Sequence, residues 1–214
     1  DVVIVGAGIN GVATARELAL RGLRVAVVEA GDFAGATSNG SSKLLHGGLR
    51  YLEHILDWFL VREAQVEKNL QIMLAPHLCH ALPFLLPFWD DSGVAPWKRW
   101  AMMFIYQRLA WGTGQPSYKH LSTAQLQQQL PGIRQTGLSE GFEYMDGQMD
   151  DHRLALENLL DARDHGAIAC SYVKVAGFVE NSAGRVIKAQ VQDMLGETSF
   201  EISGKVFINT AGPQ

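Results

Sequence analysis

The sequence is poor in residues that cross-link a chain and in long apolar runs. Its 214 residues include two cysteines, Cys79 and Cys170, which lie far apart and outside any CxxC pattern. We therefore expect two free thiols in a reducing compartment rather than a disulfide or a zinc site. No apolar run reaches the roughly twenty residues that a membrane-spanning helix needs, so no such helix is predicted.

Charge is also sparse. Charged residues make up 19% of the chain, and the formal net charge at pH 7 is -4. A surplus of basic residues is typical of nucleic-acid binding, so we do not expect a nucleic-acid partner. The histidines show no metal-ligand spacing, and no metal site is predicted. With 47% hydrophobic residues, the chain is long enough for one substantial core and a second lobe.

What is present at the N-terminus is the pattern of a dinucleotide-binding unit. The apolar run Val2–Val5 is typical of a buried parallel strand, and Gly6, Gly8 and Gly11 follow it with GxGxxG spacing. A helix and a second strand are expected next, and the strand ends in Glu29. In this pattern the first glycine permits a tight turn, the second lets the backbone approach a pyrophosphate, and the third lets helix and strand pack closely.

Glu29 favours a bound dinucleotide over a glycine loop that binds no ligand. A carboxylate at the end of the second strand accepts hydrogen bonds from an adenosine ribose, which favours NAD or FAD over NADP. The alternative is a glycine-punctuated turn without a ligand, and that alternative leaves Glu29 unexplained.

A dense polar segment, residues 37 to 53, follows this unit. Four hydroxyl residues fall within six positions of it, where they could contact a diphosphate or a ribityl chain or could cap a polar loop. Gly47 and Gly48 allow unusual dihedral angles where backbone meets a planar ring. Arg50 has the planar fork that suits a phosphate, although a solvated surface arginine is the simpler alternative. The hydroxyl residues are Thr37, Ser38, Ser41 and Ser42.

These motifs resemble the FAD-dependent glycerol-3-phosphate dehydrogenases. The most specific match is Ser41 to Glu53, and further matches continue through Ala75–Leu78 and Gly141–Tyr144 to Asn209–Pro213. The resemblance implies an α/β fold of the glutathione-reductase-like and D-amino-acid-oxidase type: a Rossmann-like FAD-binding domain with an inserted α+β cap. It also implies that the chain is the N-terminal part of a longer protein, so that further flavin and substrate contacts lie outside it.

The resemblance assigns the cofactor contacts residue by residue. Most surround the GxGxxG loop and the polar segment, one is a backbone contact to adenine on a later strand, and three lie near the C-terminal end. They are Gly6, Gly8, Asn10, Gly11, Glu29, Ala30, Thr37, Ser38, Ser42, Lys43, Leu44, Gly48, Val173, Ala211, Gly212 and Pro213.

His46, Arg50 and Tyr51 are the expected substrate-side residues. The ordinary pKa of a histidine suits removal of a proton from a secondary alcohol, so His46 is either the base or a group that positions the hydroxyl. By resemblance Arg50 contacts the substrate phosphate. Tyr51 could donate to the substrate or simply pack, and the sequence does not separate these roles.

The reaction implied by the resemblance is oxidation of sn-glycerol 3-phosphate to dihydroxyacetone phosphate, with hydride passing from C2 to FAD N5 and electrons to a quinone. Two alternatives stay open within the same fold: an oxidase using dioxygen, and an enzyme for another hydroxy acid or amine. A non-catalytic FAD-binding or membrane-docking module is an alternative of another class. The oligomeric state, including a homodimer, is left open.

The domain boundaries expected from the pattern are residues 1–75 with 150–214 for the discontinuous FAD-binding domain and 76–149 for the cap. Within them we expect one helix over 52–75, an edge strand or extended segment over 82–88, a capped helix from Ser122 to Leu130, and a strand over 141–149 with a turn at Asp146-Gly147. A helix over 150–165 and strands over 168–179, 186–193, 199–202 and 206–209 complete the chain.

The segment from Pro96 to Trp111 is basic and rich in tryptophan. It predicts a helix that either lies in a membrane interface or packs on the cap. The membrane alternative agrees with the resembling family, whose members deliver electrons to quinone, and it implies a peripheral protein on the cytoplasmic side of the membrane. Without that contact, a cytoplasmic location is expected.

Overall fold

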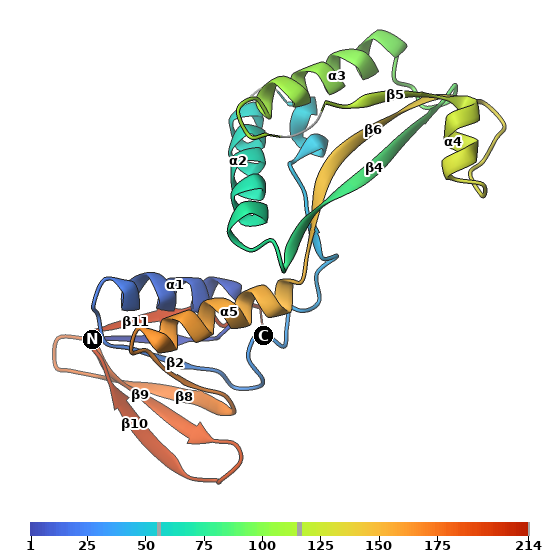
Figure 1. Ribbon diagram of the computed structural model, residues 1–214. Helices are drawn as coiled ribbons and strands as arrows, with labels where there is room; N and C mark the ends of the chain where they lie inside the picture. The colour runs from blue at the N-terminus through green and yellow to red at the C-terminus, as the bar shows by residue number, and fades with distance from the viewer. Residues whose placement is uncertain (55–56, 115–116, 214) are drawn as a thin grey trace. The chain divides into compact units, whose positions relative to one another are not determined.

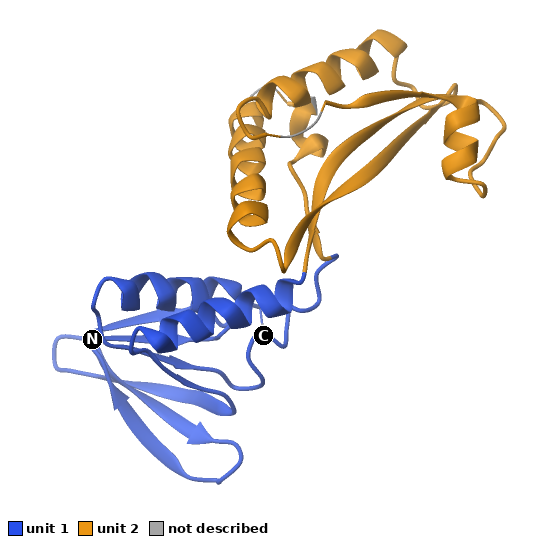
Figure 2. Ribbon diagram, viewed as in Figure 1, with its two compact units in different colours: residues 1–42, 150–214 blue, residues 43–149 orange. Residues whose placement is uncertain are grey.

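The computed structural model describes residues 1–54, 57–114 and 117–213, and it divides into two compact units (Figure 2). The first unit contains residues 1–42 and 150–214, and the second contains residues 43–149. The expected discontinuous arrangement is present, but the second unit begins at residue 43 and not at residue 76. Residues 43–75 belong there because their side chains bond the rest of that unit: Arg62 donates to the carbonyls of Leu109 and Trp111, and Lys68 pairs with Asp146.

The first unit is built on a parallel four-stranded sheet with the order β11-β1-β2-β7. Its helices pack on one face of this sheet, and an antiparallel three-stranded sheet lies against the other (Figure 1). The elements are β1 (Val2–Val5), α1 (Ile9–Leu20), β2 (Val25–Val28), α5 (Asp151–Asp164), β7 (Ile168–Cys170), β8 (Val173–Glu180), β9 (Val186–Asp193), β10 (Ser199–Ser203) and β11 (Val206–Asn209).

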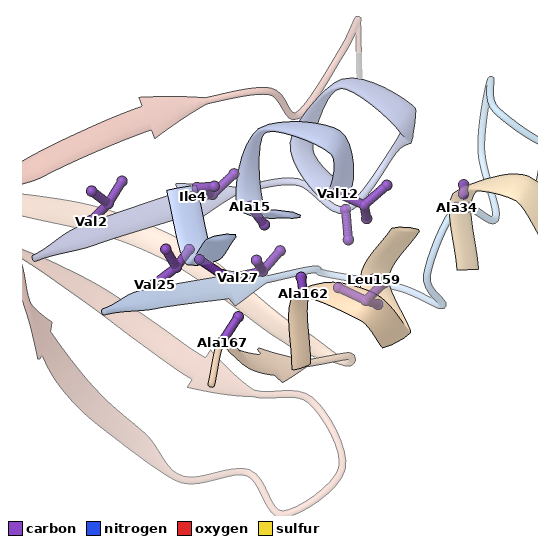
Figure 3. Packing of buried hydrophobic residues seen from close by; sticks show 13 residues of the cluster. Val2, Ile4, Val12, Ala15, Val25, Val27, Ala34, Leu159, Ala162 and Ala167 are labelled. Carbon is purple, nitrogen blue, oxygen red and sulfur yellow. The ribbon is translucent and has the colours of Figure 1, made fainter. Parts of the chain in front are cut away.

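Alternation along the strands explains these layers. Ile4 and Val27 point toward the helices and are fully buried with Ala15 of α1 and Leu159 of α5 (Figure 3). Val28 points to the opposite face, where it packs in a cluster with residues of the three-stranded sheet. Burying both faces of a parallel sheet requires continuous apolar runs, and the sequence of β1 and β2 supplies them.

The second unit contains a long antiparallel pair, β4 with β6, which β3 and β5 extend along the other edge of β6. The edge position of β4 accommodates Pro83 and Pro87 and confirms the edge strand expected there. The elements are β3 (Leu44–Leu45), η1 (Leu49–Glu53), α2 (Trp58–Leu74), β4 (Cys79–Trp89), α3 (Pro96–Leu109), β5 (Lys119–Ser122), α4 (Thr123–Gln129) and β6 (Leu138–Met149).

Helix starts follow their caps closely. The side chain of Ser122 accepts from the backbone N–H of Gln125, and the side chain of Gln125 accepts from the backbone N–H of Ser122. The predicted capping box therefore opens α4. Asp150 accepts from the N–H of Arg153 at the start of α5.

Three expected elements differ from the observed ones. The helix expected over 52–75 is divided into η1 and α2, and its residues Ile55 and Leu56 lie outside the described residues. The strand expected over 168–179 is broken between β7 and β8, where Tyr172 has a φ of 56°. The turn predicted at Asp146-Gly147 was wrong, because β6 continues through both residues.

The Asp-Gly pair fails to turn for an identifiable reason. Gly147 is paired on both sides, with Leu45 of β3 and Ala81 of β4, and a Cβ at this position would lie 3.0 Å from the carbonyl oxygen of Leu45. The glycine therefore serves the close approach of a third strand. Asp146, which in a turn would face water, is buried and bonds groups inside the unit.

Candidate functional site

A cavity of about 270 Å³ opens in the first unit, at the carboxyl ends of β1 and β11. This is the edge at which parallel α/β sheets bind their ligands. Its lining residues come from the glycine loop, from the loop after β2 and from the chain after β11. They are Gly8, Ile9, Asn10, Glu29, Ala34, Gly35, Ala36, Thr37, Ser38, Thr210, Ala211, Gly212 and Pro213.

The glycine loop at this cavity leaves no room for side chains. Gly6 has a φ of 98°, and a Cβ there would lie 2.6 Å from the carbonyl oxygen of Thr210. A Cβ on Gly11 would collide with the carbonyl oxygen of Gly6 and would lie 2.7 Å from Oγ1 of Thr210. Gly8 lines the cavity and immediately precedes α1. The backbone therefore approaches the cavity closely, at the positive end of a helix dipole.

Helix α1 presents its N-terminus to the cavity. Its N-cap residue, Gly8, has no side chain with which to cap the helix, and the first turn contains no acidic residue. The N–H of Ile9 donates to Oγ of Ser38 at 2.9 Å, which holds the loop after β2 against the start of the helix. An anion such as a diphosphate is the ligand that such a terminus favours.

Glu29 is held in place by backbone donors. Its Oε2 accepts from the N–H of Ala7 at 2.8 Å, and its Oε1 accepts from the N–H of Gly31 at 2.9 Å. Each carboxylate oxygen can accept a further bond, so the side chain is oriented and still able to accept from a ribose hydroxyl. It reaches the lining of the cavity from the end of β2, as the sequence pattern predicted.

The chain after β11 closes the cavity against the glycine loop. Oγ1 of Thr210 donates to the carbonyl oxygens of Val5 and Gly6, at 2.9 and 2.8 Å. Gly212 has a φ of 77° and no heavy atom within 4 Å of an added Cβ among the described residues, so it turns the chain at the rim. Ala211 and Pro213 line the cavity beside it.

Eight of the predicted cofactor contacts line the cavity, and Gly6 and Gly11 lie against its lining residue Thr210. Val173 is buried, and its N–H donates to the carbonyl of Glu29 at 2.8 Å, so this donor is engaged within the protein. Ala30 is exposed, and Ser42, Lys43, Leu44 and Gly48 lie outside the lining, the last three in the second unit. The eight lining residues are Gly8, Asn10, Glu29, Thr37, Ser38, Ala211, Gly212 and Pro213.

Five lining residues were not among the sequence predictions: Ile9, Ala34, Gly35, Ala36 and Thr210. Thr210 stands within the Asn-Thr-Ala-Gly-Pro motif, so its position was visible, but its bonds to the first strand were not. Ala34 has a φ of 54°, and its N–H donates to the carbonyl of Ala7. This contact brings the loop after β2 back to the glycine loop, and no local pattern indicates it.

The substrate-side residues lie in the second unit, on and before η1. His46 and Arg50 are exposed, and Tyr51 retains 43% of its surface. Gly47 and Gly48 between them are buried, and Gly48 adopts a φ of 81° at the start of η1. The three side chains are thus accessible to a solute, on a backbone segment that is itself fixed.

Beneath this segment lies a buried polar cluster that sequence reasoning missed. Oδ1 of Asp146 accepts from Nζ of Lys68 at 2.9 Å, from the N–H of Gly47 at 2.7 Å and from Oη of Tyr106 at 3.4 Å. Burial lowers the pKa of Lys68, and the carboxylate of Asp146 opposes that shift. Burial, with Asp146 second, raises the pKa of Tyr106 and raises that of Tyr144 to about 12.

Within residues 1–54, 57–114 and 117–213, no group of three or more His, Cys, Asp or Glu side chains could hold a metal ion. Over the same residues no helix is both long and apolar enough to cross a membrane.

A family model described as "FAD dependent oxidoreductase" matches residues 1–214. The chain belongs to this family. FAD is accordingly the cofactor of the fold, and the Rossmann-like architecture expected from the sequence is confirmed.

Relatives cover the whole chain. It is 39% identical to a glycerol-3-phosphate dehydrogenase of Synechocystis sp., over 100% of this chain and 39% of that protein. An alpha-glycerophosphate oxidase of Streptococcus pneumoniae is 35% identical over 100% of this chain and 35% of its own length. A solved structure, the glycerol-3-phosphate dehydrogenase from Bacillus halodurans complexed with FAD, aligns with a TM-score of 0.73 and 29% identity, over 100% of this chain and 34% of that one. The chain thus spans well under half the length of these relatives.

The cavity fits part of such a cofactor. The N-terminus of α1 and Gly8 suit a diphosphate, and the oriented carboxylate of Glu29 suits a ribose. These residues would hold the nucleotide end of FAD.

Proposed function

We propose that this chain is the FAD-binding part of an enzyme that oxidises sn-glycerol 3-phosphate to dihydroxyacetone phosphate. The observation that carries the proposal is the match over the whole chain, at 39% identity, to a protein named glycerol-3-phosphate dehydrogenase. The dinucleotide cavity of the first unit supports it independently, because its donors and its acid are those that FAD requires.

Three exposed residues are proposed to meet the substrate. Arg50 offers a bidentate fork to the phosphate, which binds tightly because both hydrogen bonds are charge-assisted. His46 takes the hydroxyl proton or orients the hydroxyl group, and Tyr51 donates to the substrate. Bound FAD would supply the hydride acceptor.

For the electron acceptor we propose a quinone. The relatives include both proteins named dehydrogenases and proteins named oxidases, so dioxygen is the specific alternative. Helix α3 supports a quinone, because it exposes aromatic residues together with cations, as peripheral membrane proteins do. Trp97 and Phe104 of the helix keep 68% and 58% of their surface, and Trp111, just after it, keeps 65%. Lys98 and Arg108 lie over the indole rings of Trp97 and Trp111. We propose peripheral contact of this helix with the cytoplasmic face of a membrane.

Anaerobic addition of sn-glycerol 3-phosphate to the complete FAD-loaded polypeptide tests the proposal. The expected result is loss of the oxidised flavin absorbance, followed by its recovery when a soluble quinone is added. In the same assay, Arg50→Ala should raise the half-reducing substrate concentration at least about tenfold, as expected for loss of a charge-assisted contact, with FAD content unchanged.

Each alternative has its own signature in this assay. Recovery with dioxygen as fast as with quinone would identify an oxidase. Reduction by a hydroxy acid or an amine in place of glycerol 3-phosphate would identify a different substrate. Bound flavin that none of these compounds reduces would identify a non-catalytic module and contradict the proposal.

A further inference from the structure

The backbone of the substrate-side segment is held from inside the second unit. Gly47, between His46 and Gly48, donates its N–H to Oδ1 of Asp146 at 2.7 Å. The donor is buried and the acceptor comes from β6, 99 residues further along the chain. A hydrogen bond to a buried carboxylate is charge-assisted and directional, so it fixes the orientation of the peptide that follows His46.

The carboxylate that holds this peptide is itself held. Lys68 of α2 pairs with Asp146 at 2.9 Å, and the two side chains keep 1% and 4% of their surface. A buried ion pair is weak support for stability, because two apolar residues of the same shape often stabilise a fold as well. A role in fixing one backbone conformation explains the ion pair better. The backbone that the pair fixes is the peptide of Gly47.

The backbone at Gly47 packs closely against two neighbouring side chains. A Cβ at Gly47 would collide with Nε2 of Gln65 and with Oη of Tyr106. Gln65 is completely buried, and its side-chain amide interacts with the hydroxyl of Tyr106. The two side chains together leave no space for a side chain at position 47.

We propose that Asp146, oriented by Lys68, is a positioning residue that anchors the Gly47 peptide and so sets where His46 and Arg50 stand. Downstream of this anchor, Gly48 enters the left-handed region and η1 begins, carrying Arg50 and Tyr51. The effect on substrate rests on the proposed function, whereas the anchoring of the peptide does not.

Two double variants of the complete FAD-loaded polypeptide isolate the anchor. Lys68→Met with Asp146→Asn and Lys68→Met with Asp146→Leu both remove the buried charges, and Asn and Leu have nearly the shape of Asp. The two variants differ only at position 146, where Asn can still accept a hydrogen bond from the N–H of Gly47 and Leu cannot. The measurements are amide hydrogen exchange over residues 44–51, the KM and kcat for sn-glycerol 3-phosphate, the FAD content and the melting temperature.

The Leu variant should exchange the Gly47 amide at least about tenfold faster than the Asn variant and should have a KM raised by a similar factor, with equal FAD content. Rescue by Asn would separate positioning from a purely structural role, which would lower the melting temperature and leave KM alone. Equal exchange in both variants overturns the anchor. Unequal exchange with equal KM overturns its effect on substrate.

Amide hydrogen exchange of the unmodified protein also tests the anchor, and this measurement does not depend on whether any variant folds. The Gly47 amide should be among the most slowly exchanging amides of residues 44–51, and fast exchange there overturns the anchor. If glycerol 3-phosphate does not reduce the flavin of the unmodified protein, the proposed function fails, and the exchange measurements still decide whether the anchor exists.

Discussion

At Gly11, in the glycine loop beside the nucleotide cavity, the fold leaves no space for a β carbon. An added Cβ would meet the carbonyl oxygen of Gly6, which is backbone, and the hydroxyl of Thr210, which holds β11 to the glycine loop. Backbone cannot move aside as the end of a side chain can, so the loop must shift. Overpacking of this kind costs about 1–3 kcal/mol. We expect Gly11→Ala to weaken FAD binding at least about tenfold, measured by quenching of flavin fluorescence.

Gly132→Ala is the matched control for this change. An added Cβ there meets no heavy atom within 4 Å among the described residues, so the substitution should alter neither FAD affinity nor melting temperature. An unchanged FAD affinity in Gly11→Ala would mean that the loop relaxes without cost. The conclusion that FAD binding depends on the close approach of the backbone at Gly11 would then be wrong.

The residue scale also shows where sequence reasoning stops. Gly6, Gly8 and Glu29 could be placed because a fixed spacing specifies them within one strand-helix-strand unit. The bonds of Thr210 to the glycine loop and those of the cluster around Asp146 could not be predicted, because the partners lie 204 and 99 residues away. Nothing in the sequence around Lys68 indicates that it pairs with a buried carboxylate.

At the scale of elements, helix α3 carries the membrane hypothesis. Its buried residues include Met103 and Tyr106, whereas Trp97 and Phe104 remain largely exposed. Aromatic side chains contribute strongly at a lipid interface, so Trp97→Ser with Phe104→Ser should reduce binding to anionic liposomes several-fold in a co-sedimentation assay. The fold should persist, because both side chains are on the exposed side of the helix.

A matched change elsewhere controls for loss of exposed apolar surface. Leu195 lies between β9 and β10 and keeps 75% of its surface, so Leu195→Ser removes an exposed apolar side chain from a hairpin. Liposome binding should stay unchanged in that variant. Equal binding by the α3 variant and the unmodified protein would instead assign these aromatic residues to contacts within a longer polypeptide.

Elements were predictable where a local signal was sufficient. The capping box of α4 and the prolines of β4 gave correct assignments from a few residues each. Asp146-Gly147 gave a wrong one, because an Asp-Gly pair favours a turn unless a third strand approaches the glycine. The approach of β3 is a tertiary contact that overrides the local preference.

At the scale of the whole molecule, the α/β class and the discontinuous order were predictable, but the first boundary was not. Helical periodicity identified α2 without indicating which sheet it covers, so the expected cap began at residue 76 rather than at residue 43. The pairing of Lys68 with Asp146 decides the assignment, and only tertiary structure reveals it.

The two-unit organisation predicts that the nucleotide cavity does not depend on residues 43–149. Every residue that lines it belongs to the first unit, as do the parallel sheet and both helices that cover it. The ends of the insertion are close together, since the Ser41 hydroxyl donates to the Asp151 carboxylate. A linker of about four Gly and Ser residues could therefore replace residues 43–149 with a small cost in loop closure.

In the complete polypeptide, this replacement should leave FAD affinity within about tenfold of the parent value. It should also abolish reduction by glycerol 3-phosphate, because His46, Arg50 and Tyr51 are removed. Fluorescence titration measures the affinity, and the same deletion carrying Gly11→Ala provides the control for binding at the intended cavity. A folded deletion variant that binds no FAD would show that the second unit supplies essential cofactor contacts, which the family resemblance implies for Lys43, Leu44 and Gly48.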